Sequence, residues 1–352
     1  MAEASCLLVH LTIDCVGFMN FNRLQLDPHQ VEVGEAKMKR FCLAVLVLCL
    51  PLTNVMGQTA DAPAATLQER TEALFKPSLD LLDVKLTVDA MVDASVRIDV
   101  VKAEIDRMAT TIAAMAGENG DEATRLNALK RYLYESGVWN QNNPFRYDLS
   151  DPLGSMPANR LLQRYLVTRR GNCVTMPILF VVLGQRIGLR MTLVEAPLHL
   201  FVKYTDADGK AWNLEPTSGG GFTRDEWYRQ KLPMSDKAVA NGVYLRALSH
   251  EESVAVIASF LLEHEIDAGQ FENALSVSDI LLRHYPNFAY GLVKRGSAYH
   301  GLLRRELATK YSREEDIPPD LKAEADQWYR QNAEAFAKAE ALGWRPQDGE
   351  AR

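Results

Sequence analysis

One apolar segment constrains the fold more than any other part of this 352-residue chain. Ile178–Leu183 is apolar on every side, which is typical of a helix buried in the middle of a domain. The residues just before it suit a helix start. Gly171 permits a tight turn, and the side chain of Asn172 can accept a backbone N–H of the first helical turn. We therefore expect the regular helix to begin near Val174 or Thr175.

Cys173 lies at or just before the start of this helix. The unpaired N–H groups and the dipole at a helix N-terminus favour a thiolate over a thiol. A sulfur held in this position is suited to act as a nucleophile. The alternative is an inert buried cysteine, which is what a lone cysteine usually is.

The N-terminal residues have the pattern of a secretory signal. A positively charged start at Met38–Arg40 precedes a short apolar run, and small residues lie near Gly57. We expect residues 1–37 to be an upstream extension and residues 38–57 to be a signal peptide cleaved near Gly57, leaving an exported and periplasmic protein. An uncleaved anchor at Phe41 to Leu52 is the alternative, although the run is short for a membrane span. We expect no stable membrane span.

Cleavage near Gly57 changes the cysteine count. Four of the five cysteines (Cys6, Cys15, Cys42 and Cys49) precede that point, so the exported protein would keep only Cys173. It would contain no internal disulfide, although export usually means an oxidising compartment. A single thiol there is a liability unless it is used or shielded, which favours a catalytic role.

Composition and motifs exclude several classes of function. A hydrophobic content of 47% is ordinary for a globular protein, and the length predicts two or three domains. The net charge is −7, and no Lys/Arg-rich run with interleaved aromatic residues occurs, so we expect no nucleic-acid partner. Calcium-loop, zinc-spacing and phosphate-loop patterns are also missing, so we expect no metal and no cofactor.

Helices precede the cysteine turn and strands follow its helix. Apolar residues at three- and four-residue steps predict a helix over Val84–Met115, and a second helix is expected over Glu122–Ser136. Three strands are expected over Met191–Ala196, Pro197–Tyr204 and Lys210–Glu215, the last two joined by an Asp-Ala-Asp-Gly turn. The central helix should pack across this antiparallel sheet.

The hairpin places two further polar residues near the cysteine. His199 and Glu215 come to the same end of neighbouring strands, and Cys173 on the crossing helix completes a line of thiol, imidazole and carboxylate. An imidazole can take the thiol proton, and a carboxylate on its other nitrogen fixes the tautomer. The alternatives are a core histidine at His199 and a strand end at Glu215.

Three short motifs resemble the transglutaminase-like superfamily. They are Gly-Asn-Cys at 171–173, His-Leu-Phe-Val at 199–202 and Trp-Asn-Leu-Glu-Pro-Thr at 212–217. The resemblance covers roughly Leu79 to Trp227 and includes the helical N-terminal part of the bacterial branch. It implies an α+β, papain-like core of helices packed on an antiparallel sheet, which we assign to residues 66–246.

The resemblance also implies the roles of the three residues. Cys173 is the expected nucleophile, His199 the base and Glu215 the group that orients the imidazole, where the family usually has an aspartate. For the oxyanion hole we can name only the backbone N–H of Cys173.

The C-terminal part should be all-α. Gly269, Ala274 and Pro286 stand at offsets that resemble a tetratricopeptide repeat, and a second repeat starts near Phe288. We assign residues 251–345 to tetratricopeptide-like helical repeats. They would either form a groove for a protein partner or substrate, or cap the core domain.

The sequence thus favours an exported transglutaminase-like cysteine enzyme. It would hydrolyse an amide or transfer an acyl group through a thioester, as an amidohydrolase, peptidase or acyltransferase, on a peptide or protein substrate. The alternative is a non-catalytic binding scaffold that combines a degenerate transglutaminase-like domain with a repeat module.

Overall fold

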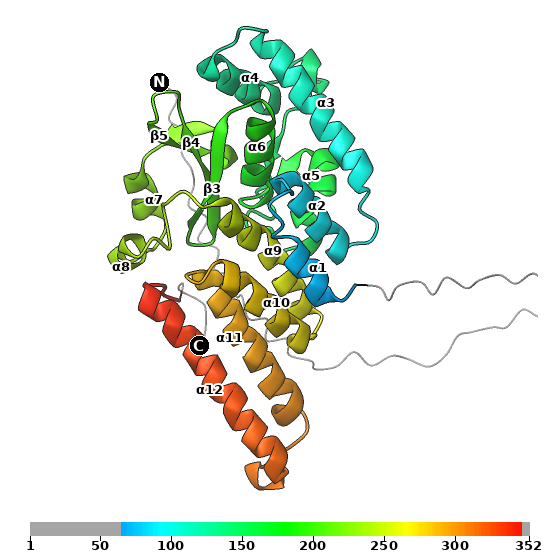
Figure 1. Ribbon diagram of the computed structural model, residues 1–352, viewed down its shortest axis with the longest axis vertical. Helices are drawn as coiled ribbons and strands as arrows, with labels where there is room; N and C mark the ends of the chain where they lie inside the picture. The colour runs from blue at the N-terminus through cyan, green and yellow to red at the C-terminus, as the bar shows by residue number, and fades with distance from the viewer. Residues whose placement is uncertain (1–64, 347–352) are drawn as a thin grey trace, which may run out of the picture. The chain divides into compact units, whose positions relative to one another are not determined.

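Four helices open the part of the chain that the computed structural model describes, residues 65–346 (Figure 1). They are α1 (Leu67–Ala73), α2 (Leu81–Val92), α3 (Ile98–Ala116) and α4 (Glu122–Tyr134). The predicted extension and signal peptide lie outside the described residues.

The expectation of one continuous helix over Val84–Met115 is wrong, because α2 ends at Val92 and α3 begins at Ile98. Asp93 leaves the helical conformation with φ −136°, and its carboxylate accepts the backbone N–H of Ser95 at 2.9 Å. Such a local side-chain bond competes with helical bonding and makes a turn between the two helices.

A segment of short elements leads from α4 to the cysteine. They are η1 (Val138–Asn140), β1 (Arg146–Tyr147), η2 (Pro157–Arg160), α5 (Leu162–Thr168) and β2 (Arg170–Gly171). β1 and β2 pair in parallel as a separate two-stranded sheet.

Gly171 is needed for close packing rather than for a tight turn. It lies in β2, and a Cβ atom there would come within 2.5 Å of the Tyr165 ring and 2.6 Å of Met176 Cγ. The left-handed residue of this connection is Arg169, with φ 57°.

The helix after the cysteine and the sheet that follows agree with the sequence pattern. The elements are α6 (Thr175–Arg186), β3 (Arg190–Ala196), β4 (His199–Thr205), β5 (Ala211–Glu215) and β6 (Gly221–Thr223). The strands pair antiparallel in the order β3-β4-β5-β6. The start of α6 and the three expected strands are confirmed, and β6 is an addition. Beyond them lie η3 (Pro216–Ser218), α7 (Asp225–Lys231) and α8 (Asp236–Ala240).

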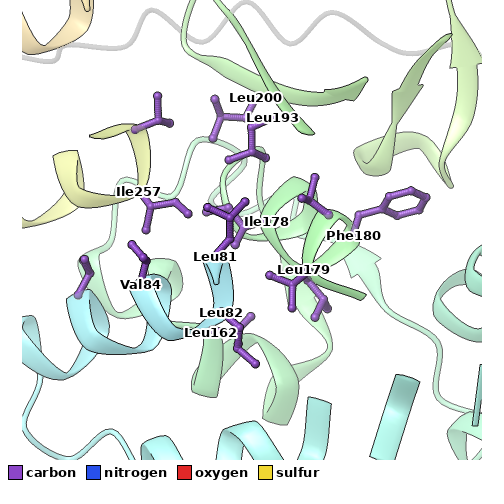
Figure 2. Close-up of a cluster of buried hydrophobic side chains, with 14 of the residues drawn as sticks. Leu81, Leu82, Val84, Leu162, Ile178, Leu179, Phe180, Leu193, Leu200 and Ile257 are labelled. Carbon is purple, nitrogen blue, oxygen red and sulfur yellow. The ribbon is translucent and has the colours of Figure 1, made fainter. Parts of the chain in front are cut away.

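The sheet has two buried faces. Leu193 and Leu200 belong to the large cluster that also contains the α6 residues Ile178 and Leu179 (Figure 2). The alternate residues of the same strands, Val194 and Phe201 among them, form a second cluster with Tyr228 of α7. The side chains of β4 therefore alternate between the two faces of the sheet, and α6 and α7 pack against opposite faces.

The C-terminal part is helical, as expected. It contains α9 (His250–Asp267), α10 (Phe271–His284), α11 (Ala289–Leu303), the π-helical turn η4 (Arg304–Ala308), η5 (Glu314–Asp316) and α12 (Pro319–Leu342). Each of the four long helices packs against the next.

Helix α9 shares the core of the N-terminal part. Every residue from Ser253 to Leu262 is buried, and Ile257 lies in the same cluster as Val84 of α2 (Figure 2). Together these elements form a mixed, helix-dominated fold with two small sheets. Within residues 65–346 no helix combines the length and apolar character needed to cross a membrane.

Candidate functional site

Cys173 lies one residue before Val174, the N-cap residue of α6, in the position that the sequence predicts. The Asn172 carboxamide oxygen accepts the backbone N–H groups of Val174 and Thr175, both at 3.0 Å. This cap, expected from the sequence, satisfies two of the amides left over at the helix start. Cys173 is 2% exposed and is the free cysteine of the described residues.

His199 and Glu215 are in direct contact. His199 begins β4 and Glu215 ends β5, and His199 Nε2 lies 2.8 Å from Glu215 Oε2. The two side chains are 14% and 4% exposed. Because Nε2 faces the carboxylate, Nδ1 is the ring nitrogen left for the hydrogen bond between the His199 and Cys173 side chains. The structure thus brings the three predicted residues together in the predicted order.

The carboxylate of Glu215 is held on both oxygens. Oε1 accepts the backbone N–H of Thr217 at 3.0 Å and its hydroxyl at 2.5 Å, and Oε2 accepts the hydroxyl of Tyr228 at 2.8 Å. Burial by itself raises the pKa of Glu215, but the bonds with His199, Thr217 and Tyr228 outweigh it and hold the pKa below its usual value. The residue is therefore a charged, fully bonded carboxylate at neutral pH.

The same contacts act on His199. Burial by itself lowers the pKa of the imidazole. The hydrogen bonds and charge interactions with Cys173 and Glu215 outweigh this effect and raise the pKa to about 10. The ring is therefore an imidazolium at neutral pH, next to the sulfur on one side and the carboxylate on the other.

Two backbone carbonyl groups lie against Cys173. The oxygen of Pro152 accepts the Cys173 N–H at 3.0 Å, and the oxygen of Leu198 accepts from the thiol at 3.5 Å. The Cys173 N–H, which the sequence analysis names for the oxyanion hole, is thus bonded to the Pro152 oxygen in this conformation. Leu198 is left-handed, with φ 53°, although it has a side chain. Strain of this kind is concentrated at functional sites.

The loop that carries Pro152 is internally bonded. The carboxylate of Asp151 accepts the backbone N–H groups of Ser155 and Met156 at 2.6 and 3.1 Å, and the side-chain amide of Asn159 at 2.8 Å. We call residues 151–160 the site loop.

The site loop is also tied to the C-terminal helices. Arg160 donates to the carbonyl oxygen of Gly154 at 2.5 Å and forms a 2.8 Å ion pair with Glu263 of α9. Lys294 of α11 lies 3.6 Å from the other oxygen of Glu263. Glu263 thus joins the loop at Cys173 to two helices of the C-terminal part.

The sequence analysis did not identify Pro152 or Tyr228, and it included Thr217 in the 212–217 motif without giving it a role. Thr217 follows Glu215 by two residues and could have been recognised as a local cap of the carboxylate. Pro152 and Tyr228 lie 21 residues before Cys173 and 13 residues after Glu215, and no periodic pattern relates them to the site. No group of His, Cys, Asp and Glu side chains within residues 65–346 is arranged to hold a metal ion.

A family model covers the part of the chain that carries the three residues of this site. Residues 99–257 match the family model of the transglutaminase-like superfamily. The matched segment contains Cys173, His199 and Glu215 and extends into α9.

Bacterial UPF0162 proteins are similar to part of the chain. A UPF0162 protein of Buchnera aphidicola subsp. Schizaphis graminum is 28% identical over 162 residues, which is 44% of this chain and 56% of that protein. UPF0162 protein YchA of Escherichia coli K12 is 25% identical over 159 residues, 44% of this chain and 55% of that protein.

A longer match is found in Xylella fastidiosa strain 9a5c, whose UPF0162 protein is 23% identical over 259 residues, 72% of this chain and 83% of that protein. The chain spans little more than half the length of the Buchnera and Escherichia relatives. No solved structure matches it significantly.

Proposed function

We propose that this chain is a cysteine enzyme of the transglutaminase-like type, with Cys173 as nucleophile, His199 as acid and base, and Glu215 as the group that orients the imidazole. The 2.8 Å contact of His199 Nε2 with a fully bonded Glu215 carboxylate carries the proposal. It leaves Nδ1 to exchange a proton with the sulfur, which is what a thiolate nucleophile requires.

The proposed reaction starts at an amide carbonyl of a peptide or protein. The thiolate of Cys173 attacks the carbonyl carbon, the C–N bond breaks, and the amine leaves with a proton from the His199 imidazolium. A water molecule or a second amine then attacks the thioester. Its proton passes to His199, the C–S bond breaks, and the acid or new amide leaves the thiolate of Cys173 free.

Attack also requires access and an oxyanion donor. Because Pro152 occupies the Cys173 N–H, the substrate carbonyl oxygen would have to take the place of the Pro152 oxygen. We propose that the site loop moves when substrate binds.

The competing function is a binding scaffold without turnover. The observations that favour it are the 2% exposure of Cys173 and the bonded state of its amide. In that case the three residues would serve only as a buried polar network.

Alkylation of Cys173 by iodoacetamide separates the two functions. We expect labelling to stay fast at pH 6, where an ordinary thiol of pKa about 8.5 is almost unreactive. His199→Ala should slow it at least about tenfold at that pH, since the imidazolium no longer stabilises the thiolate. Peptide mapping assigns the label, and Cys173→Ala is the blank. Slow labelling that rises only above pH 8 in both proteins would favour the scaffold.

The C-terminal helices and the N-terminal segment complete the proposal. We propose that α9 to α12 act as tetratricopeptide-like repeats. A hollow of about 330 Å³ lies between α10, α11 and α12, lined among others by Leu275, Tyr299 and Trp328, and would receive a protein partner.

We further propose export to the periplasm after cleavage near Gly57. An N-terminus near Gln58 in protein purified from its native host would support it.

A further inference from the structure

Tyr228 reaches the site from the opposite side of the sheet. It lies in α7, which packs on the face that α6 does not cover, and it is fully buried. Its ring stacks on Phe201 of β4 with centroids 4.0 Å apart, and lies 6.1 Å from the ring of His199. Tyr228 is therefore fixed against the strand that carries the imidazole.

The hydroxyl of Tyr228 bonds the same oxygen that His199 bonds. Both contacts to Glu215 Oε2 are 2.8 Å, while Thr217 holds the other oxygen. A glutamate has one more rotatable bond than an aspartate, so it needs more restraint to hold one geometry. Without the Tyr228 hydroxyl, only His199 would hold Oε2.

We propose that Tyr228 is a positioning residue that holds Glu215 charged and aimed at His199, and so sets the lower pH limit of Cys173 reactivity. This inference rests on the proposed function. The hydroxyl does not touch substrate or the sulfur, and it acts only through Glu215.

The other titratable and charged groups around this assembly come from several elements. They are Tyr134 of α4 near Glu215, Arg160 of the site loop near Cys173, and Asp225 of α7 near Tyr228. None of the three occupies Oε2, so removal of the Tyr228 hydroxyl leaves that position unfilled.

Tyr228→Phe tests the proposal, because it removes the hydroxyl and keeps the ring on Phe201. A hydrogen bond to a charged group favours the charged form about tenfold or more, which moves its titration by about one pH unit. We therefore expect the acidic midpoint of Cys173 alkylation to rise by about one pH unit, with a plateau above it within about twofold of the unchanged protein.

Tyr204→Phe is the matched control. Tyr204 lies in the same strand as Phe201, faces the other side of the sheet, and donates to Glu122 at 3.1 Å. We expect Tyr204→Phe to leave the acidic midpoint of Cys173 alkylation unchanged. Melting curves of both variants show whether either change acts through stability alone, since that would lower Tm without moving the midpoint.

If the Tyr228→Phe protein does not fold, a second variant tests the same proposal. Site-specific 3-fluorotyrosine at position 228 keeps the ring and the hydroxyl but makes the hydroxyl a stronger donor, so the midpoint should fall. A midpoint unchanged in whichever variant folds overturns the role of Tyr228. If instead His199→Ala leaves wild-type alkylation unchanged at pH 6, the proposed function itself is wrong, and the Tyr228 proposal is overturned with it.

Discussion

Burial and hydrogen bonds shift the pKa values of buried carboxyl groups in this protein in opposite directions. At Glu215 the hydrogen bonds outweigh burial, so the pKa is lowered and the carboxylate stays charged. Glu195 on β3 shows the reverse. It accepts the hydroxyl of Tyr285 at 3.2 Å and lies near Arg246, but burial dominates and raises its pKa to about 8. Between its ordinary pKa and about 8, the folded protein holds a proton at Glu195 that the unfolded chain has lost.

This proton makes the stability of the protein depend on pH. Since the folded state binds more protons over that window, the free energy of unfolding falls as pH rises from about 4.5 to about 8. Glu195→Gln removes the titration and can still accept from Tyr285. We expect it to be neutral at pH 4.5 and to stabilise by about 1–3 kcal/mol at pH 8.5, measured by urea unfolding.

Glu251→Gln is the control, because Glu251 is exposed at the start of α9. The pH dependence of that variant should follow the unchanged protein. Equal curves for Glu195→Gln and the unchanged protein would show that Glu195 ionises normally in the folded state.

At the scale of elements, the site loop lies against Cys173, and we propose that it limits access to the sulfur. It covers the cysteine amide through Pro152, and Asp151 holds it in shape through three hydrogen bonds. Arg160 and Glu263 fasten its other end to α9. A loop bonded this way closes the site as long as its own contacts persist.

Asp151→Ala should therefore open the loop. The variant releases three donors that shape the loop, so the Pro152 carbonyl, which also accepts the Tyr147 hydroxyl at 3.2 Å, is held less firmly over the Cys173 amide. We expect iodoacetamide labelling of Cys173 to rise about tenfold or more at pH 7. Asp148→Ala is the matched control, since within residues 65–346 the Asp148 carboxylate accepts hydrogen bonds only from the backbone N–H and the hydroxyl of Ser150. Labelling rates that stay equal in all three proteins would mean that the loop does not limit access.

At the scale of the whole described chain, the two halves share one core. Helix α9 is buried on all sides between Ser253 and Leu262, whereas the buried residues of α12 are three alanines. Burial of apolar surface is the main stabilising contribution to folding. We therefore expect removal of α9 to destabilise the protein much more than removal of α12.

Two truncations test this difference. A protein that ends at Arg246 exposes the apolar contacts of α2 with α9, and we expect it to aggregate or to melt without cooperativity. A protein that ends at Ala308 loses α12 but keeps α9 to α11, and we expect it to stay soluble and to show a sharp transition in calorimetry. A cooperative transition in the shorter protein would show that the C-terminal helices are a separate domain and not a cap.

The sequence by itself determined the features that depend on near neighbours. The start of α6, the capping by Asn172, the three strands and the alternation along β4 follow from residue type and period, and these bring Cys173, His199 and Glu215 together. The break at Asp93 is also local, but the apolar period of Val84–Met115 conceals it. Tertiary structure alone decided the rest. Pro152 reaches the cysteine amide and Tyr228 reaches Glu215 only after the sheet, α7 and the site loop have packed, since a contact across a fold depends on three-dimensional placement and leaves no spacing in the chain.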